Sequence, residues 1–216
     1  MKAKKVLKVI GIVLVVLILL VLIHTIRNFT IIRGLQKKFE QYSASGDFNV
    51  RTHSLQDGTT IDIDYYKKDE KEAMIMNRTK EGQTSKISSY NNGSRIDTFY
   101  DTKDSKVAKL NSNTSINMSI SNGIETDSNF QTFILCMISS VKKVKVNQIE
   151  CYLIKNFKSP ASLNGASKNE IYVEKNTGLL TKSVLNDQVM NREYEFNNVD
   201  DSTFIEPNIR EYTLQE

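Results

Sequence analysis

The longest uninterrupted apolar run of the chain lies close to its start. Val9–Ile23 carries no charged residue, and with its flanks the stretch over residues 6–26 forms roughly 31 Å of helix, enough to cross a bilayer core. A cleaved signal peptide would have a shorter apolar segment ending in small residues, whereas His24–Asn28 follows here. The pattern predicts an uncleaved transmembrane anchor over residues 6–26.

The charges that flank this run predict its orientation. Four of the first eight residues are lysines, and a short basic segment before a first transmembrane helix usually stays in the cytoplasm. Residues 1–5 are therefore expected to be a cytoplasmic N-terminus. The rest of the chain is expected outside the cell membrane, as a single-pass protein.

A second helical pattern follows the apolar run. Ile31, Leu35 and Phe39 recur every four residues, which is the spacing of one helical face. Residues 27–46 are therefore expected to form a juxtamembrane helix and linker, broken at Ser43–Gly46. Two interpretations remain open: the helix packs on the following domain, or its basic amphipathic surface lies on anionic lipid.

Beyond residue 46, the period of the pattern changes from helix to strand. Ile61–Tyr65, Ile116–Ile120 and Arg192–Phe196 each alternate apolar and polar side chains. Turn signals such as Asp57-Gly58 separate such runs at short intervals. Period-two alternation at hairpin spacing predicts an antiparallel sheet with one face in solvent, over an extracytoplasmic domain of residues 47–216.

One segment of this domain keeps a helical period. Between Asp127 and Val141, apolar residues occur at i, i+3, i+4, i+7, i+8 and i+11, and Asp127 or Ser128 is placed to cap the N-terminus. The middle of the segment is apolar all round, so this helix is expected to be buried on most sides. The predicted fold class is α+β, mainly antiparallel β, with one helix across the sheet.

Composition and charge narrow the choice of partners. The chain is 39% hydrophobic and 25% charged, which suits a globular protein with a core. Residues 1–46 hold eight of the 29 basic residues and one of the 25 acidic ones. The remaining 21 basic and 24 acidic residues give the main domain a net charge of −3, which argues against a nucleic-acid partner. Abundant Asn and Lys are typical of low-GC Gram-positive bacteria.

The residues that usually carry catalysis are scarce. The chain has two histidines, of which His53 occupies an outward-facing strand position without a Gly-x-Ser-x-Gly motif nearby. Asp62 with Asp64 alternates with apolar residues, as a solvated strand face does, and so does Glu193 with Glu195. No zinc-ligand spacing and no phosphate-binding glycine loop is present. The sequence predicts no enzyme, no metal site and no cofactor.

The two cysteines stand in apolar contexts. Cys136 lies within the predicted helix, and Cys151 shares a strand face with Ile149 and Leu153, which favours inert thiols over a nucleophile of the sortase type. Both alternatives for their pairing stay open: two buried free thiols, or a disulfide between helix and strand.

Two motifs near the C-terminus resemble a known superfamily. YVEKNTGLLTK, over residues 172–182, resembles the hairpin of LolA-like lipoprotein-carrier and RseB-like envelope proteins, and YEFNNV…DSTF…P, over 194–207, resembles their closing strand. The middle of the chain is similar to uncharacterised membrane-anchored proteins of clostridia. The resemblance implies an unclosed antiparallel β-barrel wrapped on a buried helix. This chain differs from the soluble or lipidated carriers of that family in having a fixed membrane helix.

These observations predict a binding protein of the cell envelope. A sheet with an apolar helix across it can enclose an apolar ligand, namely a lipid, an acyl chain or a lipoprotein segment. The same side chains can equally fill a solid core. The alternative is a regulatory or scaffolding module that binds another envelope protein. The expected ligand-lining residues combine one strand with the helix: Ile61, Ile63, Tyr65, Phe130, Phe133, Ile134 and Met137.

Overall fold

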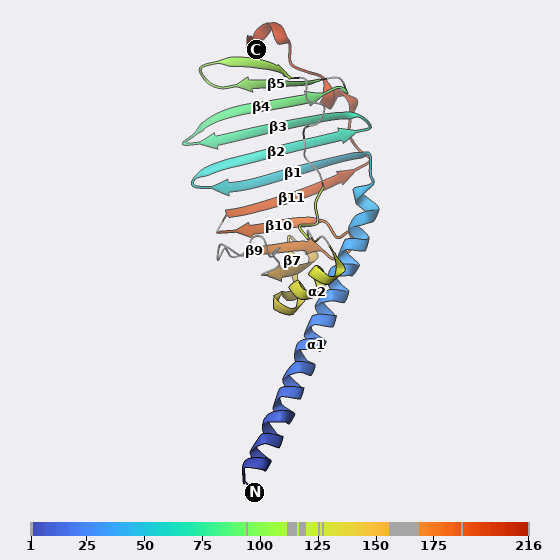
Figure 1. Cartoon of the computed structure of the whole chain (residues 1–216). Helices are drawn as coiled ribbons and strands as arrows, with labels where there is room; N and C mark the ends of the chain where they lie inside the picture. Colours follow the sequence, from blue (N-terminus) through green and yellow to red (C-terminus); the bar gives the residue numbers. More distant parts are fainter. Residues whose placement is uncertain are drawn as a thin grey trace.

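A single long sheet and two helices make up the structure, a computed structural model that describes residues 2–93, 95–111, 116, 120–124, 126, 128–155, 169–186 and 188–215 (Figure 1). The helices are α1 (Lys2–Ser43) and α2 (Asn129–Ile138), and 3-10 turns η2 (Asp201–Phe204) and η3 (Ile209–Glu211) lie near the C-terminus. The strands are β1 (Asp47–Gln56), β2 (Thr59–Lys68), β3 (Lys71–Lys80), β4 (Gln83–Asn91), β5 (Ile96–Asp101), β6 (Lys106–Asn111), β7 (Ser140–Val146), β8 (Ile149–Lys155), β9 (Asn169–Glu174), β10 (Leu180–Leu185), β11 (Gln188–Phe196) and β12 (Thr213–Gln215).

The strands are ordered β12-β6-β5-β4-β3-β2-β1-β11-β10-β9-β8-β7, so the sheet stays open with β12 and β7 at its edges. Every pairing is antiparallel except that of β12 with β6. Asp57 and Gly58 both take positive φ at the β1–β2 turn, as a type I′ hairpin requires. The predicted α+β class with an unclosed antiparallel sheet is confirmed. Of the three predicted strands, Ile116–Ile120 includes residues 117–119, which lie outside the described residues.

Helix α1 is continuous through both segments that the sequence separated. Residues 6–23 project from the domain with their apolar side chains exposed, whereas Thr25 is buried against it (Figure 1). The helix is long and apolar enough to cross a membrane. Further along, Ile32 and Leu35 are 0% and 2% exposed. The juxtamembrane half of α1 therefore packs on the sheet rather than on lipid, and a fragment beginning at residue 47 would lack two core side chains.

The two faces of the sheet are both used for packing. We call the face that meets α1 the helix face; on it, Ile32 and Leu35 pack with Ile154, Ile171 and Val173 from the strands nearest α2. A second cluster on the same face lies further up the sheet and consists of Phe48, Val50, Tyr65, Ile120 and Leu179. Two aromatic side chains of α1, Phe39 and Tyr42, pack against it. The helix face thus carries two clusters of buried side chains beneath α1.

The opposite face, which we call the outer face, carries a smaller core that the sequence analysis did not predict. Ala73, Tyr90 and Phe99 are buried there under the C-terminal segment, whose contributions are Phe204, Ile209 and Tyr212. Phe99 and Tyr212 meet edge to face, with ring centroids 5.0 Å apart. β12 pairs with β6 and thereby forms one edge of the sheet.

A pair of carboxyl groups lies under this C-terminal cover. Asp97 is buried, and its Oδ2 accepts hydrogen bonds from Arg95 Nε at 3.0 Å and Nη2 at 2.7 Å. Burial raises the pKa of Glu206, and the negative charge of Asp97 beside it raises it further, against the opposing effects of Arg95 and Asn92. The folded chain therefore binds a proton at Glu206 more readily than the unfolded chain does.

We expect stability to depend on pH through Glu206. Because the folded-state pKa is raised, the free energy of unfolding falls as pH rises from the ordinary glutamate value of 4.5 through the folded pKa. Glu206→Gln should remove this fall and leave the variant more stable than the parent above that window. Denaturant unfolding at a series of pH values measures it, with Glu193→Gln on the exposed outer face as control. An unchanged pH profile in Glu206→Gln would contradict the assignment.

Helix α2 begins where the sequence predicts and is buried on one side. Ser128 Oγ accepts the hydrogen bond of Gln131 N at 3.1 Å, so Ser128 is the N-cap, while Asp127 lies outside the described residues. Thr132, Leu135 and Cys136 are buried. Phe130 and Ile138 are 76% and 59% exposed, so the expectation of burial on most sides is wrong. The reason is that α1 and the sheet contact one face of a helix that is apolar all round.

Candidate functional site

A row of apolar side chains crosses five strands on the helix face. Five residues lie side by side through strand pairing: Ile63 of β2, Met76 of β3, Ile87 of β4, Tyr100 of β5 and Val107 of β6. We call these five residues the cross-strand row. All five are half-buried, in contrast with the buried core beneath α1. Neighbouring strands lie about 4.8 Å apart, so the row extends for roughly 19 Å, a length comparable with that of an extended acyl chain.

Two polar side chains continue the row past β2. Ile63 pairs with Thr52 of β1, and Thr52 pairs with Arg192 of β11. Among the described residues, Thr52 Oγ1 and Arg192 Nε are buried atoms without a hydrogen-bond partner. Since buried polar atoms are nearly always paired, a hydroxyl and a guanidinium on neighbouring strands are available here to bind a ligand oxygen. The row therefore has an apolar body and a polar end.

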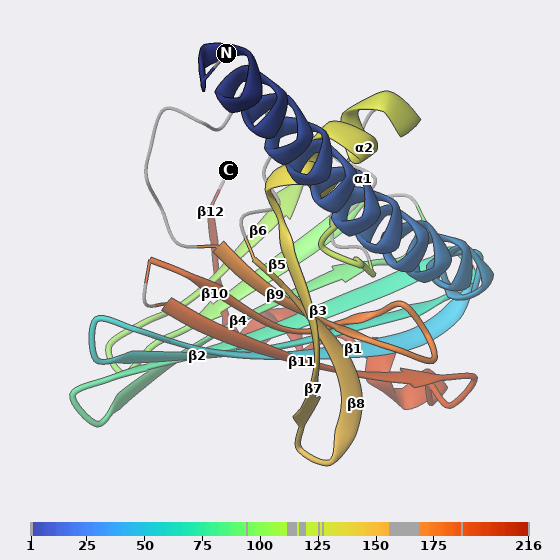
Figure 2. The same cartoon turned by 90° about the horizontal axis from the view of Figure 1, so that it is seen from below.

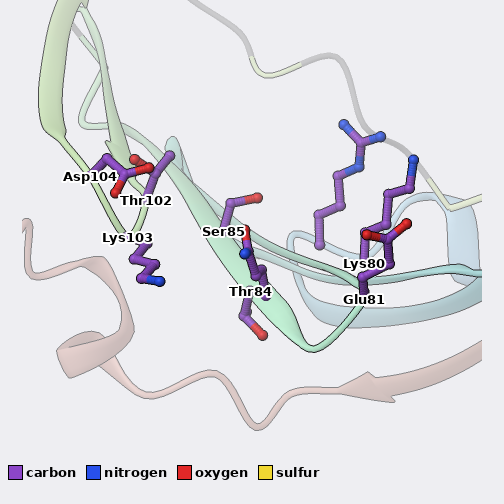
Figure 3. Close-up of a pocket in the computed structure, with 9 residues that line it drawn as sticks. Lys80, Glu81, Thr84, Ser85, Thr102, Lys103 and Asp104 are labelled. Atoms are coloured by element: carbon purple, nitrogen blue, oxygen red, sulfur yellow. The ribbon is translucent and has the colours of Figure 1, made fainter.

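The hollow drawn in Figure 3 borders the row at the far ends of two hairpins. It has a volume of about 420 Å³ and is lined by the β3–β4 turn, including Lys80 and Glu81, and by the β5–β6 turn, including Lys103 and Asp104. The labelled charged side chains spread around the hollow and do not converge on one point (Figure 3). This arrangement suits a solvated rim rather than a catalytic centre.

The structure does not bring the seven predicted ligand-lining residues together. Ile61 and Ile63 lie half-buried on the helix face, whereas Tyr65 lies in the core beneath α1. Phe133 packs edge to face on Phe29 of α1, at 5.8 Å between ring centroids. The other three predicted residues are exposed on α2: Phe130, Ile134 and Met137. A ligand-lining role of Ile61 and Ile63 stays a prediction.

Tyr65 belongs to a polar network that holds the core segment in place. Its hydroxyl donates to Glu72 Oε1 at 2.9 Å, and Glu72 Oε2 accepts from Asn91 Nδ2 and from the backbone N–H of Ile116, each at 3.1 Å. Burial alone would raise the pKa of Glu72, but these hydrogen bonds and the charge of Lys67 hold it below its ordinary value. Burial, followed by the charge of Glu72, raises the pKa of Tyr65. The network stabilises packing and leaves Tyr65 no freedom to meet a ligand.

The cysteines are separate, buried thiols. Cys136 and Cys151 are both free, which decides the alternative that the sequence left open. Burial raises the pKa of the Cys136 thiol to about 11. Cys151 Sγ lies 3.5 Å from Thr181 Oγ1, and burial likewise raises its pKa. Thiols of raised pKa are poor nucleophiles at neutral pH.

His53 lies on the outer face among charged side chains. Its Nδ1 is 2.6 Å from Asp62 Oδ1, and the neighbouring Arg51 pairs with Asp64 at 3.3 Å and with Glu195 at 3.9 Å. The charged side chains surround a hollow of about 310 Å³. The prediction that these carboxylates form a solvated face agrees with their ion pairs and exposure.

Sequence reasoning missed four members of the cross-strand row and its polar end. Met76, Ile87, Tyr100 and Val107 each lie in a strand, but alternation within a strand gives only the face and not the register with its neighbours. Arg192 was part of a predicted strand, Arg192–Phe196, in which it shares a face with Tyr194 and Phe196. A basic residue on an otherwise apolar strand face was the available signal.

Comparisons with known proteins support the fold. No protein-family model and no curated protein matches the chain. Among solved structures, it is similar to an uncharacterised conserved protein from Thermus thermophilus, with 8% identity over 85% of this chain and 98% of that one and a TM-score of 0.50. A DUF1329 family protein from Desulfovibrio piger also matches, with 12% identity over 84% of this chain and 97% of that one and a TM-score of 0.32. MucB in complex with MucA(peri) matches with 12% identity over 77% of this chain and 56% of that one and a TM-score of 0.34. Both TM-scores are too low to carry an argument.

Proposed function

We propose that the protein is a membrane-anchored binding domain whose cross-strand row takes an elongated amphiphile, such as a lipid, a fatty acid or the acylated end of a lipoprotein. One observation carries the proposal: five half-buried apolar side chains in register end at two buried, unpartnered polar atoms, Thr52 Oγ1 and Arg192 Nε, among the described residues. The apolar chain lies along the row, and its carboxylate or phosphate accepts from Arg192.

The placement of the domain supports the same proposal. Helix α1 ties the domain to a membrane, which is an immediate source of amphiphiles. The basic N-terminus favours a cytoplasmic start and an extracytoplasmic domain. Binding in this proposal involves no chemical step, so His53 and Cys151 have no part in it.

Photolabelling of the full chain in lipid nanodiscs with a diazirine fatty acid tests the proposal. Adducts are expected on β3 and β4 peptides, and Met76→Asp should lower their yield about tenfold, the effect of losing about 1.4 kcal/mol of binding free energy. Arg192→Gln should lower it as well, because the headgroup loses its charged partner.

Asn77→Asp is the matched control for this labelling, because it adds the same charge one residue on, where the strand points to the outer face. Labelling of the α1 span provides an internal positive signal in every sample. Adducts confined to α1, with none on the sheet, would contradict the proposed ligand.

A second candidate is a regulatory or scaffolding module that binds another envelope protein. The observation that favours it is the charged hollow on the outer face, around Arg51, His53 and Asp62, which suits a polar protein surface better than a lipid. A photo-crosslinking residue at Glu193 on that face should then capture one specific protein in cells. The parent chain without that residue is the control.

A further inference from the structure

Among the described residues outside the α1 span, α2 carries more exposed large apolar side chains than any other helix or strand. Phe130, Ile134, Met137 and Ile138 are 76%, 41%, 40% and 59% exposed and occupy positions i, i+4, i+7 and i+8, which is one helical face. The helix, NFQTFILCMI, contains no charged residue. A helix on the surface of a soluble domain normally turns charged side chains outwards, so this face calls for an apolar partner.

Contacts with α1 fix α2 at the level where the membrane span ends. Asn28 Nδ2 donates to the carbonyl oxygens of Cys136 at 3.2 Å and Ser139 at 3.0 Å, and His24 Nε2 lies 3.0 Å from the same Ser139 oxygen. His24 directly follows the uncharged run Val9–Ile23. Ile138, next to Ser139, therefore lies beside the last apolar turn of the span.

The edge strand β7 adds positive charge on the same side of the molecule. Lys142, Lys143 and Lys145 extend exposed from β7, the last strand of the sheet. Figures 1 and 2 place α2 and the β7–β8 hairpin at the end of the domain from which the N-terminal half of α1 leaves. Glu150 is nearby, and it pairs with Lys175 at 2.6 Å. Lysines on an edge strand also protect it from pairing with other chains.

We propose that this end of the domain is a membrane-binding surface: the exposed face of α2 inserts between the headgroups of the membrane that α1 spans, and the three β7 lysines contact anionic lipid phosphates. The inference rests on α1 being the span and is independent of the amphiphile proposed for the cross-strand row. Apolar insertion beside a basic strip is the pattern by which interfacial helices bind bilayers. With α1 as a single tether, the second contact holds the sheet upright, with β7 at the lipid and β12 farthest from it.

Because the chain contains no tryptophan, the fluorescence of a single introduced tryptophan reports on the surroundings of that one position. Phe130→Trp and, as control, Leu214→Trp on β12 each place one tryptophan at an exposed apolar position, at opposite ends of the sheet. The full chain is reconstituted into nanodiscs of phosphatidylcholine and phosphatidylglycerol, with and without brominated phosphatidylcholine. The tryptophan at 130 should emit at shorter wavelength and lose intensity with the brominated lipid, whereas the tryptophan at 214 should do neither.

Two results would contradict the proposed membrane-binding surface. Emission at position 130 as red-shifted and unquenched as at 214 means that α2 faces water, and a blue shift without quenching means that a protein surface or a second copy covers it. The lysines are tested by replacing Lys142, Lys143 and Lys145 with glutamine in the Phe130→Trp chain. Quenching should then fall in the anionic nanodiscs and stay constant in pure phosphatidylcholine. If the glutamine replacements left quenching in the anionic nanodiscs unchanged, the lysines would have no part in membrane binding.

Discussion

Replacing Gly178 with alanine is expected to lower the free energy of unfolding by about 2–5 kcal/mol. Gly178 has a φ of +75°, where a side chain costs roughly 1–2 kcal/mol, and its added Cβ would lie 2.2 Å from the carbonyl oxygen of Leu35 and 2.9 Å from the backbone nitrogen of Phe39. Backbone atoms of a packed helix cannot rotate away, so α1 must shift, at a further cost of about 1–3 kcal/mol. Denaturant unfolding of the full chain in micelles, followed by near-UV circular dichroism of the tyrosines, measures the loss.

Gly58→Ala separates the two causes. Gly58 has nearly the same φ, +72°, but no atom lies within 4 Å of the position that a Cβ would take. Only the conformational strain should therefore appear in this variant. Equal losses in the two variants would mean that the β9–β10 turn does not meet α1 as closely as described.

Replacing Tyr65 with alanine is expected to destabilise the fold by about 3–5 kcal/mol, the usual cost of removing a large buried aromatic side chain. Tyr65 is fully buried, its ring lies 5.8 Å from that of Phe48, and its hydroxyl donates to Glu72. The variant should unfold at lower denaturant concentration by the same optical measurement.

Ile63→Ala, two residues away on the same strand face, is the comparison. Ile63 is half-buried, so its replacement should cost only about 1 kcal/mol of stability. It should nevertheless lower the labelling of β3 and β4 by the diazirine fatty acid, because it removes part of the cross-strand row. If Ile63→Ala destabilised the chain as strongly as Tyr65→Ala, the division of the helix face into a core and an accessible row would be wrong.

The sequence predicted the elements of this fold better than their contacts. Alternation in Ile61–Tyr65 correctly placed the apolar side chains on one face, where Tyr65 is buried. The hairpin that residues 172–182 resemble is present as β9, a turn and β10. The close approach of Gly178 to α1 could not be predicted, because a glycine needed for positive φ looks the same as one needed for backbone contact.

The candidate site was harder to predict than the fold, because it depends on register across strands. Ile63 was named from its own strand, but its neighbours Met76 and Ile87 follow from hairpin geometry that no single strand reveals. The predicted partnership of β2 with α2 failed for a related reason. Apolar periodicity located α2, but its hydrogen bonds to Asn28 place it against α1 instead.

The same limit applies to the C-terminal segment. By resemblance, YEFNNV with the following DSTF and proline suggested a closing strand, and Tyr194–Phe196 do lie in β11. Phe204 and Tyr212 instead cover the outer face, which the charges of Asp62 and Asp64 had suggested was wholly solvated. Polar alternation along one strand describes that strand's surroundings and not those of β3 to β5.

The most direct test of the binding role is a photo-crosslinking amino acid, benzoylphenylalanine, placed at Met76 of the full chain in living cells and compared with the same group at Asn77. The two positions are consecutive in β3 and point to opposite faces. The account predicts a lipid or acyl adduct by mass spectrometry at position 76 and none at position 77. The absence of any adduct at 76, the same adduct at both positions, or an adduct at 76 to a protein that carries no acyl chain would contradict it.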